Sequence, residues 1–242
     1  MNVKPHRSAI DVIAFDADDT LWHNEPLFSE TKGKFVRLLT RYRTEEWVGR
    51  RLDETEMRNI EHFGYGIKGF TLSMIETAVE LTEGRISGDE IMEILGFARE
   101  MISHPVELLE GVEETIISIS KSHELMIITK GDLFDQESKI ARSGLGDYFK
   151  SVEIVSQKTP RTYETIMAKH GFQPSRFLMV GNSMKSDILP VVAAGGRAVH
   201  IPYPTTWIHE EAGDYDPEQV RFGEVGRISL LPDFLNELEC IR

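Results

Sequence analysis

The sequence predicts an α/β fold in which a parallel sheet is interrupted, after its first strand, by an all-helical segment. From about residue 112 onward, short apolar runs alternate with helix-like segments, a pattern typical of β-α-β units with right-handed crossovers. An apolar run at 10–15 stands apart from the others, and the simplest arrangement lets it join the later sheet. With 242 residues, the chain has room for one large domain or two small ones.

The isolated run, Ile10–Phe15, is short, rich in β-branched residues and followed by a polar turn, as expected of a buried strand. Between about Leu27 and His104, the apolar residues recur at helical spacing. This middle segment is therefore expected to be a helical domain inserted after the first strand. The predicted domains are a sheet domain of residues 1–21 and 107–242, and a helical domain of residues 22–106.

Polar residues follow each predicted strand. The later strands are predicted at 124–129, 151–156, 176–181 and 197–201. Open parallel sheets bind ligands at the carboxyl ends of their strands, so residues at those ends are candidates for a site. They are Asp16, Asp18, Asp19 and Thr20 after the first strand, Thr129, Lys130 and Gly131 at the second, Lys158 after the third, and Asn182 and Asp187 after the fourth.

Such an edge would combine carboxylates, a hydroxyl, an ammonium and backbone N–H groups. This set suits a phosphate beside a divalent cation, because Mg²⁺ prefers oxygen ligands and typically uses one or two carboxylates plus phosphate oxygens. A carboxylate can attack phosphorus, and the metal offsets the repulsion between the two anions. A second acid nearby can protonate the departing oxygen and later take a proton from water.

These residues resemble a known family. DADDT at 16–20, Thr129, Lys158 and GNSxxxD at 181–187 match, in order, the four motifs of the haloacid dehalogenase-like (HAD) hydrolase superfamily. The resemblance covers the first 21 or so residues and roughly 110–200, and the helical insert is similar to the all-helical (C1-type) cap of that family. It implies a Rossmann-like parallel sheet core with an inserted all-α cap domain.

The resemblance also implies roles for individual residues. Asp16 corresponds to the nucleophile and Asp18 to the general acid/base, which favours a phosphatase over the dehalogenase and phosphonate-cleaving branches, where this second acid is absent. The expected phosphate-binding residues are Thr129, Lys130, Gly131 and Lys158, and the expected Mg²⁺ ligands are Asp16, the Asp18 carbonyl, Asn182 and Asp187.

The sequence departs from the family pattern at two positions. Asp19 stands where the family usually has Gly, and Asn182 where the fourth motif usually has Asp. Because an amide oxygen can bind Mg²⁺ only as a neutral ligand, either Asn182 binds in that way or Asp187 takes the larger share. Asp19 is expected to point away from the site as a turn residue.

The insert contains Gly64-Tyr65-Gly66-Ile67-Lys68-Gly69, which matches the GxGxxG dinucleotide fingerprint. That fingerprint needs a preceding strand, and here the flanking residues look helical, so a turn between two helices is expected. In capped members of the family, the corresponding turn often faces the site, so Tyr65 and Lys68 are candidate substrate contacts. His23, which follows the first motif, is a candidate for the entrance to the site.

Composition narrows the class of protein. The chain is 40% hydrophobic and 28% charged, which is ordinary for a globular protein, and its net charge of -13 argues against a nucleic-acid partner. Its apolar runs are too short to span a bilayer or to form a secretory signal, so no membrane partner is expected. One cysteine suits a reducing compartment, and a cytoplasmic monomer or homodimer acting on a small phosphorylated substrate is expected.

Two other functions stay open at this point. A phosphotransferase or mutase would use the same aspartyl phosphate and pass the phosphoryl group to another hydroxyl instead of water. A non-enzymatic phospho-receiver or binding module would also combine acids, a hydroxyl and a lysine on a parallel sheet. However, the phosphorylated Asp of a receiver follows its third strand, where this chain has Lys158. Sugar phosphates, nucleoside monophosphates and phosphorylated acids all fit as substrates.

Overall fold

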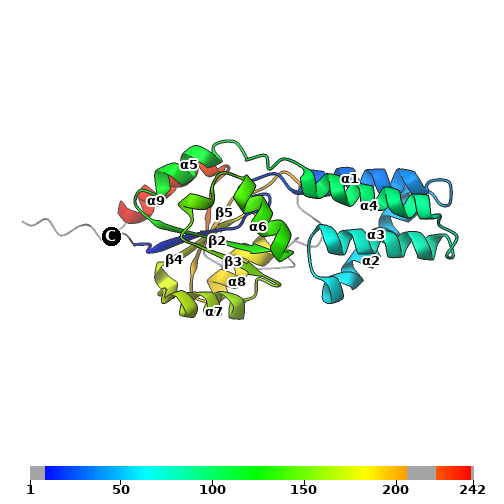
Figure 1. The fold of residues 1–242 in the computed structure, drawn as a ribbon. Coiled ribbons are helices and arrows are strands. Elements are labelled where there is room, and N and C mark those ends of the chain that lie inside the picture. The colour runs from blue at the N-terminus through cyan, green and yellow to red at the C-terminus, as the bar shows by residue number, and fades with distance from the viewer. Residues whose placement is uncertain (1–8, 206–221, 241–242) are drawn as a thin grey trace, which may run out of the picture. The chain divides into compact units, whose positions relative to one another are not determined.

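The computed structural model describes residues 9–205 and 222–240. The chain forms two compact units, each built from segments that are distant in sequence (Figure 1). The first unit consists of Met1–His23, Glu107–Thr129 and Ser143–Arg242, and the second of Asn24–Val106 and Lys130–Arg142. The first unit carries the sheet, and the second is helical.

The described part of the sheet has six strands in the order β3-β2-β1-β4-β5-β6. They are β1 (Val12–Phe15), β2 (Glu124–Lys130), β3 (Ser151–Val155), β4 (Phe177–Gly181), β5 (Arg197–His200) and β6 (Gly223–Glu224). The first strand pairs in parallel with both β2 and β4, so it lies inside the sheet. This confirms the predicted α/β fold and the joining of the isolated first run to the later sheet.

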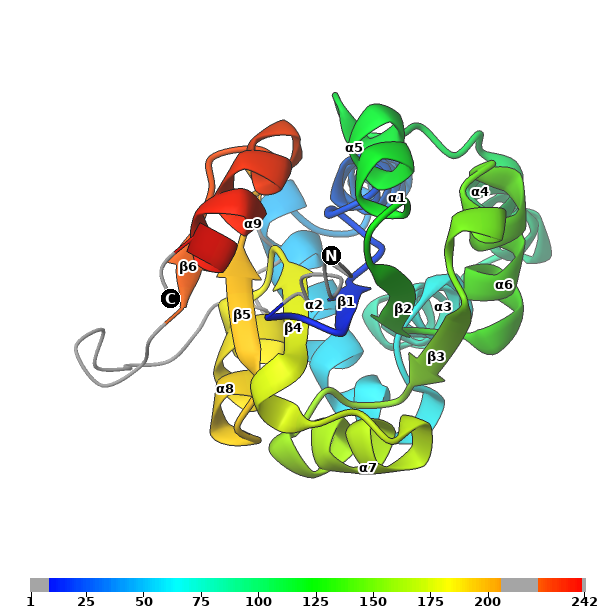
Figure 2. The same cartoon turned by 90° about the vertical axis from the view of Figure 1, so that its left-hand side faces the viewer.

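Helices cover both faces of this sheet, with α5 and α9 on one face and α7 and α8 on the other (Figure 2). Residues 12–15 of β1 are consequently all fully buried, which explains a run without polar residues. The helices of this unit are α5 (Val112–Ile119), α7 (Pro160–His170), α8 (Leu189–Ala193) and α9 (Leu231–Cys240), with short turns η1 (Gly146–Tyr148), η2 (Pro174–Arg176), η3 (Met184–Ile188) and η5 (Ile228–Leu230).

The second unit consists of α1 (Glu25–Leu39), α2 (Glu45–Phe63), α3 (Ile67–Leu81), α4 (Gly88–Ser103) and α6 (Leu133–Arg142). Helix α4 begins with a capping box, in which the Ser87 hydroxyl and the Glu90 carboxylate satisfy each other's backbone N–H groups. Apolar side chains of α1 to α4 form one core, which includes Phe35, Leu52, Met74 and Ile94. In the Gly64–Gly69 segment, residues 64–66 form the turn between α2 and α3, and the last three residues are the first of α3.

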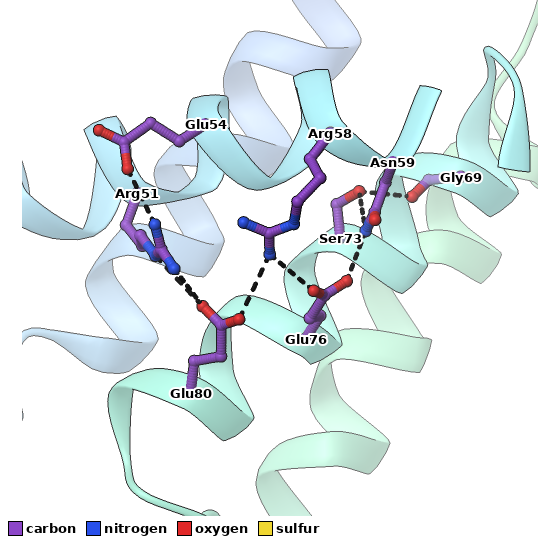
Figure 3. A network of polar contacts seen from close by, with 8 residues as sticks. All are labelled: Arg51, Glu54, Arg58, Asn59, Gly69, Ser73, Glu76 and Glu80. Carbon is purple, nitrogen blue, oxygen red and sulfur yellow. Dashed lines mark hydrogen bonds and ion pairs between the residues drawn. The ribbon is translucent and has the colours of Figure 1, made fainter. Parts of the chain in front are cut away.

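A polar network joins α2 to α3 (Figure 3). Asn59 is buried, and its side-chain amide donates to the Ser73 hydroxyl at 3.2 Å and to the Glu76 carboxylate at 2.6 Å. Ion pairs extend the network to Arg51, Glu54, Arg58 and Glu80. The amide nitrogen of Asn59 therefore has two acceptors on α3, and these hydrogen bonds favour one register of α2 against α3. Within the described ranges, no helix is both long and apolar enough to cross a membrane.

Candidate active site

A buried lysine lies between two carboxylates at the carboxyl edge of the sheet. The Lys158 ammonium donates to Oδ1 of Asp16 and, at 2.6 Å, to Oδ1 of Asp187. Asp16 directly follows β1, Lys158 lies three residues after β3, and Asp187 belongs to the turn η3 after β4. The lysine side chain is only 1% exposed. Three segments far apart in sequence therefore meet at one charged centre.

Burial and charge act in opposite directions on these groups. Burial raises the pKa of the Asp16 carboxyl to about 7, although the Lys158 ammonium lowers it in part. Burial alone would lower the pKa of Lys158, but the attraction of the two carboxylates raises it above its ordinary value. Asp16 is consequently held near the point where it gains or loses a proton, while Lys158 stays charged.

Asp187 is fully buried, and both of its carboxylate oxygens are engaged. Oδ1 accepts from Lys158, and Oδ2 accepts from the backbone N–H of Ser183 at 3.0 Å. The carboxyl lies so close to Gly181 that a Cβ at that position would collide with it. The close approach of Asp187 therefore requires the glycine of the fourth motif, and it places the Asp187 carboxylate against the Lys158 ammonium.

Thr20 links the first and fourth motifs. Its hydroxyl lies 3.3 Å from Oδ2 of Asp16 and 3.1 Å from Oδ1 of Asn182, and it also accepts from the Asn182 backbone N–H at 3.1 Å. One oxygen of Asp16 and the amide oxygen of Asn182 thus converge on the same atom. Sequence reasoning gave Thr20 no role of its own, although its place in DADDT was the available signal.

Asp18 is held by a second residue that the sequence analysis missed. The indole N–H of Trp22 donates to Oδ1 of Asp18 at 2.7 Å, and the indole is 1% exposed. The intervening Asp19 has a φ of 60°, in the left-handed region that glycine adopts most easily. The turn therefore explains why the family usually has Gly at this position.

His200, at the end of β5, is a third residue that the sequence analysis missed, and it lies outside all four motifs. One ring nitrogen lies 3.1 Å from the backbone carbonyl oxygen of Asn182, and the other lies 2.9 Å from the Glu224 carboxylate in β6. The histidine braces the loop that carries Asn182 against the edge strand.

The remaining predicted residues fall in two groups. Thr129 is buried at the end of β2 in the first unit, and His23 in the same unit lies 2.7 Å from the Tyr203 hydroxyl. Lys130, Gly131, Tyr65 and Lys68 belong to the second unit. There, the Lys130 ammonium lies 4.6 Å from the centre of the Tyr65 ring, and Lys68 forms a 3.0 Å ion pair with Asp132.

Across residues 9–205 and 222–240, no three His, Cys, Asp or Glu side chains are grouped in a way that could hold a metal ion. The Thr20 hydroxyl instead contacts both a carboxylate oxygen of Asp16 and the neutral amide oxygen of Asn182. Any cation at this edge would therefore meet a mixture of carboxylate and neutral oxygens.

Comparison with known proteins identifies the family. A family model described as haloacid dehalogenase-like hydrolase matches residues 10–195. The solved structure of a haloacid dehalogenase-like family hydrolase from Xanthomonas campestris is 40% identical, with a TM-score of 0.84, and the match covers 96% of this chain and 93% of that chain. No curated protein sequence matches.

More distant structures share the fold. The HAD phosphatase from Thermococcus onnurineus is 18% identical with a TM-score of 0.62, covering 93% of this chain and 98% of that chain. The L-2-haloacid dehalogenase from Xanthobacter autotrophicus is 15% identical with a TM-score of 0.60, covering 94% of this chain and 98% of that chain. At these identities the likeness shows the fold alone. The family model and the Xanthomonas structure show more: this chain belongs to the haloacid dehalogenase-like hydrolases.

Proposed function

We propose that this hydrolase is a Mg²⁺-dependent phosphatase that acts on a small phosphorylated metabolite through an aspartyl phosphate on Asp16. The observation that carries the proposal is a second acid, Asp18, two residues after the buried Asp16. A phosphate ester needs a proton donor for its departing oxygen, whereas a departing halide does not. The pair of acids therefore favours ester hydrolysis over dehalogenation.

The residues at the site fit a magnesium ion. Asp16 and Asn182 place oxygens around a shared neighbour, and a backbone carbonyl such as that of Asp18 is a further ligand of the type that Mg²⁺ accepts. Asp187 is assigned to holding Lys158, because both of its oxygens are already engaged. When bound, the metal would neutralise charge on the transferring phosphoryl group and on Asp16.

The chemistry of the chain's own residues follows in two steps. An oxygen of Asp16 attacks phosphorus, the ester P–O bond breaks, and Asp18 gives its proton to the departing alkoxide. Water then attacks the phosphorus of the aspartyl phosphate while Asp18 takes a proton from that water. The bond between phosphorus and the Asp16 oxygen breaks, which releases inorganic phosphate and restores the Asp16 carboxylate. Lys158 and Thr129 are assigned to the equatorial phosphoryl oxygens, where a cation and a hydroxyl stabilise the transferring charge.

The helical unit is proposed to act as the cap that selects the substrate. Tyr65 and Lys68, in the turn before α3 and at its start, are its candidate contacts. A cap that excludes water suits small substrates better than macromolecules.

The first test replaces Asp16 with Asn and measures phosphate release from a panel of metabolite esters, with and without Mg²⁺. Loss of turnover below detection is expected, because the amide cannot form the covalent intermediate. The exposed Asp147→Asn is the matched control and should retain full activity. The same panel includes 2-haloacids, and halide release without phosphate release from any ester would contradict the proposal. Phosphate release with water as the sole acceptor separates hydrolysis from phosphoryl transfer.

A further inference from the structure

We propose that Trp22 is a positioning residue for Asp18, holding one carboxylate oxygen so that the other carries the proton to and from the reacting phosphate. This role rests on the proposed function, in which Asp18 is the general acid and base. The Trp22 indole N–H lies 2.7 Å from Oδ1 of Asp18. An indole N–H can only donate, so Oδ1 is an acceptor in this arrangement.

The indole is held where it is by the backbone around it. The Asp19 N–H donates to the Trp22 carbonyl at 2.8 Å, and the Leu21 N–H donates to the Ala17 carbonyl at 2.8 Å. The Trp22 backbone also forms isolated β-bridges, one with Asp18 and one with Leu108. A fully buried ring in a turn tied at these points has little freedom, so its N–H is a fixed donor.

A fixed donor makes the two oxygens of Asp18 different. A free carboxyl rotates, and either oxygen can carry the proton. With the indole on Oδ1, the proton needed by the leaving alkoxide resides on Oδ2, and the same oxygen later accepts a proton from water. Because the orientation is set before the substrate arrives, the reaction does not have to order Asp18 in its transition state.

A purely structural role makes a different prediction. Buried tryptophans generally find an acceptor for the indole N–H, and Asp18 could serve only to satisfy it. In that case, losing the N–H would cost stability, and any effect on activity would be the same for all substrates. A positioning role instead predicts a loss that depends on how much the leaving group needs a proton.

Trp22→Phe removes the N–H and retains an aromatic ring. We expect kcat/KM for alkyl phosphates to fall about 10- to 100-fold, which is part of the ~10²- to 10⁴-fold that general acid catalysis contributes. For aryl phosphates with strongly acidic phenols, such as 2,4-dinitrophenyl phosphate, kcat/KM should change less than about threefold, because that leaving group departs without a proton. Trp47→Phe is the matched control, because Trp47 is partly buried against the core of the helical unit, outside the proposed site.

Equal losses on both classes of ester, or no loss on either, would overturn the role of Trp22. If wild-type protein hydrolyses neither class, the proposed function itself fails and takes this role with it. If Trp22→Phe does not fold, a second measurement on a different variant tests the same contact. The chain has three tryptophans, so the indole ¹⁵N–¹H spectrum is simple to assign. In Asp18→Asn, the Trp22 indole proton should move upfield as its charged acceptor is lost, and an unchanged resonance would overturn the proposal.

Discussion

At the scale of single residues, the site depends on one ammonium placed between two buried carboxylates. Lys158 contacts Asp16 and Asp187, and each of the three side chains is buried. Removing one partner of a buried ionic cluster costs more than the cluster contributes, because the remaining charges lose their compensation. The lysine is therefore a structural requirement of this edge as well as a proposed phosphate ligand.

Lys158→Met should lower the free energy of unfolding by about 3–5 kcal/mol at pH 8 in the absence of divalent cations. The loss should be smaller at pH 5, because the Asp16 carboxyl, whose pKa is already raised to about 7, then takes up a proton and the repulsion disappears. Urea unfolding at the two pH values measures this difference. Lys150→Met removes an exposed ion pair with Glu124 and should cost about 0–1 kcal/mol; a similar small cost at Lys158 would contradict the argument.

Asp19 provides a test of the turn that follows the two proposed catalytic acids, Asp16 and Asp18. Its φ of 60° suits glycine and strains β-branched residues. Asp19→Gly should therefore keep most of the proposed phosphatase activity and change the free energy of unfolding by less than about 1 kcal/mol, whereas Asp19→Val should lower it by about 1–2 kcal/mol. Steady-state kinetics and thermal melts check both variants. A loss of activity in Asp19→Gly as large as that in Asp18→Asn would assign Asp19 a direct role.

Much of the charged centre could be predicted at this scale, and the reason is positional. Asp16, Lys158 and Asp187 each follow a strand of a parallel sheet, so strand assignment alone brings them to one edge. Trp22 and His200 could not be found in the same way, because their roles depend on where a ring nitrogen points. Side-chain direction across a turn is set by backbone torsions that no periodicity in the sequence reports.

At the scale of elements, the charged side chains of helix α2 lie in two kinds of environment. Arg51 and Arg58 pair with acids of α3 at the surface, whereas Glu56 lies where its charged form is disfavoured. Burial, with a smaller contribution from the neighbouring Asp53, raises the pKa of Glu56 to about 7, although Lys32 lowers it in part. The helix therefore contains one acid that resists ionisation in the folded protein.

Glu56→Gln should reveal the cost of ionising Glu56 in the folded protein, because its effect on the free energy of unfolding should depend on pH. A carboxyl whose pKa is raised from 4.5 to about 7 on folding stabilises the protein below the lower value, and this contribution is lost as the pH rises through 7. The variant should thus be up to about 3 kcal/mol more stable than wild type at pH 8, and no more stable at pH 4.5. Urea unfolding across this range tests the slope. Glu61→Gln, exposed on the same helix, is the matched control.

At the scale of the whole molecule, the sequence predicted the sheet and the helical segment that interrupts it. It did not predict every element of the sheet, nor every helix of the helical unit. The joining of β1 to the later strands followed from the absence of any nearby strand. The two-residue β6 is too short to show a period of two. Helix α6 groups with the helices of the insert through contacts such as Lys139 with Asn24 and Arg142 with the His104 carbonyl, and local sequence cannot report such tertiary contacts.

The position of β1 within the sheet has a consequence for how the chain acquires its structure. The first strand leaves the ribosome early, yet its partners begin at Glu124 and Phe177, so it must wait for most of the chain. Helices α1 to α4 make contacts with near neighbours in sequence and can assemble meanwhile. The acids that follow β1 are therefore brought to Lys158 and Asp187 late in folding, and the helical insert is ready before the site that it accompanies.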